Sequence, residues 1–170
     1  QSITFSVDSS TPTVTITTSD SDNTIKPGEQ ITITANFSEA MGVTPTITIG
    51  SAVDNQALSA VSTTTYRYIW NTSGVTPTSY TVSVTGQDLA GNVNAGTDTI
   101  EITLDGTPPT VNLIDTDSDD FLISTDTVTI TAAFSEAMTL TPTISIAGTS
   151  ISGQRMTKIS VSYTHLTLPT

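Results

Sequence analysis

The sequence predicts an all-β protein built from antiparallel two-sheet β-sandwiches in tandem repeat. Apolar and polar residues alternate with period two along most of the chain, which is typical of half-buried strands. Pro, Gly, Asn and Asp separate the alternating runs, and no stretch has helical periodicity. A long segment also recurs after a constant interval of 97 residues. Together these observations predict copies of one small β-domain.

The first half of a repeat carries four expected strands. Residues 13–17, 31–37 and 46–49 alternate apolar residues with Thr or Asn, and residues 58–61 do so less clearly. Thr suits the solvent-facing side of a strand, because its β-branch fits the pleat while its hydroxyl faces water.

The second half carries three more strands, at 66–70, 80–84 and 100–104. The first of these places three aromatic residues on one face, which favours burial over an exposed binding platform. Seven strands in about 97 residues fit two packed sheets. The side chains expected to face the core are Val14, Ile16, Ile31, Ile33, Phe37, Ile47, Trp70, Tyr80, Val82, Val84, Ile100 and Ile102.

The repeat sets the expected domain boundaries. The pentapeptide FSEAM at 37–41 recurs at 134–138, 97 positions later. At the same interval Ile3, Phe5 and Val7 match three apolar residues of 100–104. Residues 1–8 are therefore interpreted as the last strand of a preceding repeat, 9–106 as one complete repeat, and 107–159 as the first strands of an incomplete one.

The last residues of the chain do not continue the repeat. No counterpart of residues 66–70 is recognisable after Ile159. Residues 160–170 resemble the translation of a transposase sequencing adapter, so they are interpreted as an artefactual tail and left out of the expected fold.

Composition excludes several classes of protein. The chain has 4 Lys+Arg against 16 Asp+Glu and a formal net charge of −12, so nucleic acid is not expected as a partner. No apolar run reaches the ~18 residues of a membrane span. Cysteine is absent, and the one His lies in the tail, so we expect no disulfide, no thiolate site and no hydrolytic triad. The chain is not expected to be an enzyme.

Four motifs stand out in the chain: FSEAM at 37–41, YTVSV at 80–84, DLAGN at 88–92 and the junction LDGTPP at 104–109. They resemble the bacterial immunoglobulin-like (Big-type) tandem repeats of large surface proteins and adhesins. The resemblance covers residues 1 to about 159. It implies immunoglobulin-like antiparallel β-sandwiches, with Tyr80 placed as the tyrosine corner. It also implies an extracellular location on the bacterial cell surface, with neighbouring repeats as partners and any host-cell or matrix ligand bound by other domains.

In such a sandwich, the turns after 31–37 and after 80–84 lie at the pole where the chain enters. This brings Asp8, Glu39 and Asp88 together, and Asn92 would add a carbonyl oxygen. Clustered carboxylates without basic partners are suited to Ca²⁺, which takes six to eight oxygen ligands. The alternative is a solvated acidic rim that keeps the array soluble.

The same reasoning predicts a second calcium site at the next junction. Asp105 and Glu136 would form it, and Asp20 and Asp22 would lie near it. The Asp-Ser-Asp-Asn sequence at 20–23 is equally good turn chemistry.

The expected function is a non-catalytic spacer or stalk, stiffened by Ca²⁺ at the junctions between repeats. The alternative is a carbohydrate- or protein-binding accessory module of a secreted protein, which would need exposed aromatic side chains. Ice binding by Thr arrays is a third and weaker interpretation, because Thr alternation already follows from strand burial.

Overall fold

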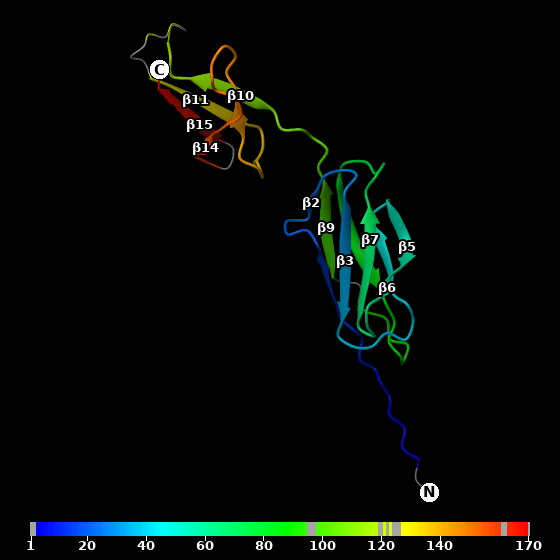
Figure 1. The fold of residues 1–170 in the computed structure, drawn as a ribbon. Helices are drawn as coiled ribbons and strands as arrows, with labels where there is room; N and C mark the ends of the chain where they lie inside the picture. The colour runs from blue at the N-terminus through cyan, green and yellow to red at the C-terminus, as the bar shows by residue number, and fades with distance from the viewer. Residues whose placement is uncertain are drawn as a thin grey trace. The chain divides into compact units, whose positions relative to one another are not determined.

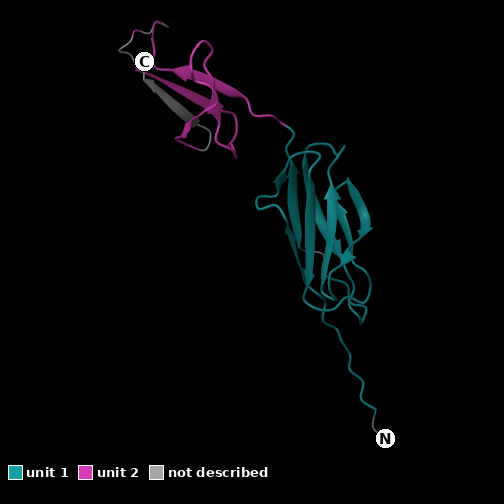
Figure 2. Cartoon of the chain, viewed as in Figure 1, with its two compact units in different colours: residues 1–106 teal, residues 107–170 magenta. Residues whose placement is uncertain are grey.

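The computed structural model describes residues 3–94, 98–118, 121, 123, 127–160 and 163–169. The chain divides into two compact units, residues 1–106 (unit 1) and residues 107–170 (unit 2), which Figure 2 shows in different colours. The division falls where the sequence places the start of the second repeat. Among the described residues, none belongs to a helix that is long and apolar enough to cross a membrane.

Unit 1 is an immunoglobulin-like antiparallel β-sandwich (Figure 1). Its first sheet has the order β1-β3-β7-β6 and its second sheet the order β2-β9-β8-β4-β5. All neighbouring strands are antiparallel except β2 and β9, which are parallel. The first sheet consists of β1 (Val14–Thr18), β3 (Gln30–Phe37), β7 (Thr65–Asn71) and β6 (Ser59–Ala60). The second consists of β2 (Thr24–Ile25), β9 (Thr99–Leu104), β8 (Ser79–Thr85), β4 (Thr46–Ile49) and β5 (Val53–Ala57).

The alternating residues form the core between the two sheets. Every side chain expected there is buried except Ile100, which is partly buried. The core cluster of unit 1 also contains buried apolar side chains outside the predicted set, namely Ile25, Ala35, Met41, Ile49, Val53, Leu58, Tyr66 and Leu104.

Two aromatic contacts fix the centre of the core. The rings of Trp70 and Tyr80 meet edge to face with their centroids 5.3 Å apart, and Phe37 and Tyr66 meet in the same way at 5.9 Å. The Tyr80 hydroxyl donates a hydrogen bond to the backbone carbonyl of Thr76 at 2.8 Å. This is the geometry of a tyrosine corner, so that prediction is confirmed.

The alternation of apolar and polar residues does not predict two short strands, β2 and β5. β2 has only two residues, and β5 reads VDNQA with all but Val53 exposed. Such segments carry no alternation, and β5 contains Asn55 at a φ of 48°. Their pairing with β9 and β4 is a tertiary effect.

Unit 2 repeats part of the strand arrangement of unit 1. The sheet β10-β11-β15-β14 corresponds to β1-β3-β7-β6, and β12 pairs with β13 as β4 pairs with β5. Val111 pairs with Phe134 as Val14 pairs with Phe37. The bounds are β10 (Val111–Asp115), β11 (Thr127–Phe134), β12 (Thr143–Ile144), β13 (Gln154–Arg155), β14 (Thr157–Lys158) and β15 (Tyr163–Pro169).

The end of the chain adds a strand that the sequence does not predict. Tyr163–Pro169 forms β15 and pairs with β11 in the place that 66–70 takes in unit 1, and the interpretation of 160–170 as an artefactual tail stays a prediction. In the backbone register Ile130 pairs with Leu166, as Ile33 pairs with Tyr68 in unit 1. Backbone pairing needs only N–H and C=O groups, so a sequence unlike 66–70 can add to an open strand edge.

The segment before β1 forms no strand. Residues 3–13 are irregular, and Ile3, Phe5 and Val7 are exposed. Figure 1 shows the first residues, in dark blue, running away from the sandwich of unit 1. Their assignment to a preceding repeat stays a prediction.

Candidate functional site: an acidic cluster at the N-terminal pole of unit 1

Two loops meet at the pole where the chain enters unit 1. One follows β3 and the other follows β8, and Met41 and Asp88 form an isolated antiparallel bridge between them. The amide of Gly42 donates to the carbonyl of Gln87 at 2.8 Å. A Cβ at position 42 would collide with the Asp88 carbonyl oxygen, so only glycine allows the loops to approach this closely.

Asn94 fixes the shape of the second loop from inside. Its Oδ1 accepts a hydrogen bond from the amide of Gly86 at 2.6 Å, and its Nδ2 donates to the carbonyl of Val84 at 3.0 Å. Asn94 is buried. Sequence reasoning missed this residue, because an Asn in a loop is ordinary turn chemistry until its burial is known.

The structure brings together the three acids expected at this pole. Asp8, Glu39 and Asp88 each offer a carboxylate oxygen, and these oxygens all lie within 4.8 Å of one another. Asp8 is exposed, Glu39 is half-buried and Asp88 is buried. The connecting loops at residues 38–45 and 86–94 contain no Lys or Arg.

Asp88 is held rigidly by its own loop. Its Oδ1 accepts hydrogen bonds from the backbone amides of Ala90, Gly91 and Asn92 at 2.7–2.8 Å. Burial raises the pKa of Asp88, but the hydrogen bonds from the Asn92 side chain and from these amides outweigh it and leave the pKa below its ordinary value. Asp88 is therefore ionised in the folded protein at neutral pH.

The pKa of Glu39 is shifted in the opposite direction. Its pKa is raised, first by partial desolvation and then by repulsion from the charges of Asp8 and Asp88. The folded protein thus places a third negative charge where two already lie.

Asn92 contacts two of the three acids through its side-chain amide. Its amide nitrogen donates to Oδ2 of Asp88 at 2.9 Å and to the backbone carbonyl of Asp8 at 3.3 Å. Both neighbours are acceptors, so the NH₂ group and not the carbonyl oxygen faces them. Asn92 thus positions the acids in this structure, and its role as an oxygen ligand stays a prediction.

Asp20 and Asp22 lie at the other end of unit 1, in a turn that closes on itself. Both accept a hydrogen bond from the amide of Thr24 through their Oδ1 atoms, at 3.2 and 2.9 Å. The bond from Thr24 leads the effects that lower the pKa of Asp22, followed by its interaction with Asp20. Their geometry is that of turn residues.

The turn also places these acids beside the end of β9. The amide of Thr103 donates to the carbonyl of Asn23, and the amide of Asp105 donates to the carbonyl of Ile25. Asp105 is half-buried in unit 1, and Glu136 is half-buried in the turn after β11 of unit 2. Their joint role at a junction stays a prediction.

The cluster of Asp8, Glu39 and Asp88 presents carboxylate oxygens close to one another. Such oxygens are the ligands that Ca²⁺ takes in proteins, at 2.3–2.6 Å. An ion of charge +2 would also relieve the repulsion that raises the pKa of Glu39.

Part of the chain is similar to a known protein family. Residues 12–84, which begin just before β1 and end within β8, match the family model described as a bacterial Ig domain. No curated protein matches the chain.

Proposed function

We propose, from the bacterial Ig domain that residues 12–84 carry, that this chain is a structural repeat module of a bacterial cell-surface or secreted adhesin-like protein. Domains of this kind are generally non-catalytic structural modules. The module acts as a spacer that holds other domains away from the cell. Repetition of one fold within 170 residues supports this, since copied modules add length and no new site.

We further propose that Ca²⁺ binds to Asp8, Glu39 and Asp88. The observation that supports it is the convergence of three carboxylate oxygens within 4.8 Å in loops without a basic residue. Asp8 precedes the sandwich, whereas Glu39 and Asp88 belong to it. An ion at this position would tie the incoming chain to the sandwich and stiffen the junction.

Calorimetric titration of the chain with CaCl₂, after removal of metals with EDTA, tests the site. We expect saturable binding that Glu39→Gln weakens by about tenfold or more, because one charged ligand is lost. Glu39 suits this test, since its substitution leaves the hydrogen bonds of the Asp88 loop intact.

Asp54→Asn is the matched control, because Asp54 is an exposed acid on β5 outside the cluster. It removes the same charge and should leave the affinity unchanged. Absence of calcium heat, or equal losses in the two variants, contradicts the site.

Stiffening is tested on a protein that carries several complete copies of residues 9–106. We expect EDTA to shorten its mean end-to-end distance in small-angle X-ray scattering, because the junctions regain freedom. Identical scattering with and without EDTA would leave the spacer without a calcium-dependent stiffness.

The alternative of a carbohydrate-binding module is less well supported. It requires an exposed aromatic platform, and of the aromatic residues on β7, Tyr66 and Trp70 are buried in the core.

A further inference from the structure

The chain crosses unit 1 from one end to the other. It enters at the pole of the acidic cluster, and β9 ends at the opposite end, beside the turn at residues 20–23 (Figure 1). In the spacer role proposed above, the domains on both sides pull on these two ends, so tension enters through β1 and leaves through β9. The contacts that join the first strands to the last strand therefore decide how unit 1 resists tension.

The most direct of these contacts is the pairing of β2 with β9. The two strands are parallel, with Ile25 beside Leu104 in the register. The amide of Thr103 donates to the carbonyl of Asn23 at 2.8 Å. The amide of Asp105 donates to the carbonyl of Ile25 at 3.0 Å. Tension pulls β2 toward the entry pole and β9 toward the opposite end, so the strands must slide along each other and both hydrogen bonds are loaded at once.

The turn between β1 and β2 transmits the tension to this pair. The hydroxyl of Thr18, the last residue of β1, donates to Oδ1 of Asn23 at 2.6 Å, and Asn23 has a left-handed φ of 58°. The amide of Thr24 donates to Oδ1 of both Asp20 and Asp22. A turn closed by its own hydrogen bonds has little slack, so β1 passes tension to β2 with little extension.

Buried side chains hold both strands of the pair in the core. Ile25 is 5% exposed and Leu104 is 2% exposed. Just after β9, Gly106 lies close to two proline rings, because a Cβ at this position would come within 2.9 Å of Pro77 and 3.3 Å of Pro27. Sliding of β9 past β2 must therefore break close packing as well as hydrogen bonds.

We propose that the β2–β9 pair is the mechanical clamp of unit 1, the contact that bears tension along the chain and must part before the sandwich unfolds. Strands β3 to β8 lie between β2 and β9 in the sequence, so tension that passes through this pair bypasses them. The inference rests on the proposed spacer function and does not depend on calcium. Its test measures force on the chain itself, so the clamp and the spacer function can fail separately.

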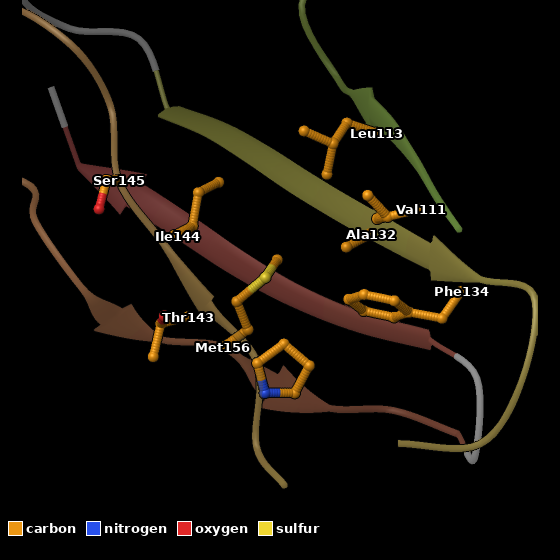
Figure 3. Close-up of a pocket in the computed structure, with 9 residues that line it drawn as sticks. Val111, Leu113, Ala132, Phe134, Thr143, Ile144, Ser145 and Met156 are labelled. Carbon is orange, nitrogen blue, oxygen red and sulfur yellow. The ribbon is translucent and has the colours of Figure 1, made fainter. Parts of the chain in front are cut away.

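Single-molecule force measurement on the full chain, in EDTA, tests the clamp. The chain has no Cys, so Ser10→Cys and Thr107→Cys provide two attachment points that load unit 1 along its strands. Unit 2, whose Phe134 and Met156 line a pocket (Figure 3), stays outside the loaded segment. Unfolding of unit 1 then releases about 300 Å of chain, at about 3.5 Å per extended residue, which identifies the event.

Ile25→Ala and Val53→Ala form a matched pair of variants. β2 and β5 are the two edges of one sheet, and Ile25 and Val53 are both buried. Each substitution leaves a cavity in the core. We expect Ile25→Ala to raise the unfolding rate at a fixed force by about tenfold or more, and Val53→Ala to change it by less than about twofold, because β5 lies outside the loaded contact. Ile25→Val removes only one methylene and should raise the rate by a smaller factor.

The direction of pulling gives a second test. Lys26→Cys combined with Thr107→Cys applies force to the same ends of β2 and β9, so the pair is peeled apart one hydrogen bond at a time. We expect the pair to part at a lower force in this direction than under the Ser10 and Thr107 attachment. Equal unfolding rates for Ile25→Ala and Val53→Ala, or equal forces in the two directions, overturn the proposal.

Discussion

Asp88 and Glu39 differ in how the folded protein stabilises their negative charges. Asp88 accepts three backbone hydrogen bonds and one from Asn92, so its charge is stabilised by its own loop. Glu39 has a raised pKa because it is partly desolvated and faces the other acids. The ionised form of Glu39 is therefore the unfavourable member of the cluster when no cation is bound.

This predicts that Glu39→Gln raises the thermal stability of the protein in a pH-dependent way. The folded protein raises the pKa of Glu39 above its ordinary value of 4.5, so the contribution of Glu39 to stability is present below pH 4.5 and is lost as the pH rises through the raised pKa. In EDTA at pH 7 the variant should unfold at a higher temperature than the wild type. Below pH 4.5 the two should coincide.

Thermal unfolding followed by Trp70 fluorescence measures this effect, since the one Trp of the chain lies in unit 1. Asp54→Asn again serves as the control. A pH-independent difference, or no difference at pH 7, would show that the cluster is not under strain.

At the level of elements, Tyr80 joins the start of β8 to the preceding turn. Its ring packs on Trp70 and its hydroxyl bonds to the carbonyl of Thr76. Without a disulfide, the attachment of this turn depends on such contacts. Tyr80 therefore contributes through its ring to the core and through its hydroxyl to the loop.

Tyr80→Phe removes the hydroxyl and keeps the ring. We expect it to lower the free energy of unfolding of unit 1 by about 1 kcal/mol, the typical contribution of one hydrogen bond. Urea denaturation monitored at Trp70 measures the change. Tyr68→Phe is the control on a half-buried ring of β7, and a loss of the same size in both variants would remove the special role of the corner.

At the scale of the whole molecule, the two units share the register of their first strand pair and differ in how far the apolar face of that pair is buried. The β1–β3 and β10–β11 pairs align equivalent residues, but β8 and β9 of unit 1 have no counterpart among the described residues of unit 2. Hydrophobic burial is the dominant stabilising term, so unit 2 should be the less stable unit.

Hydrogen exchange followed by mass spectrometry measures this difference within one chain. At low protein concentration we expect the amides of β11 to exchange faster than those of β3 by about tenfold or more, because each 1.4 kcal/mol of lost stability raises the open population tenfold. Equal protection in the two strands would mean that the exposed face of unit 2 carries no energetic cost.

The sequence by itself determined the strands that alternate, the boundary between the copies and the inward side chains from Val14 to Ile102, because period-two patterning fixes which face is buried. It also placed Asp8, Glu39 and Asp88 at one pole, since strand order alone decides which turns meet. Tertiary structure decided what pattern cannot encode. The amide of Asn92 turned toward Asp88 and the backbone of Asp8, and Asn94 was buried beneath the loop, because hydrogen-bond direction and burial depend on how the folded segments approach one another. Strand β15 also depended on tertiary structure, since the open backbone edge of β11 accepts a strand whatever its side chains are.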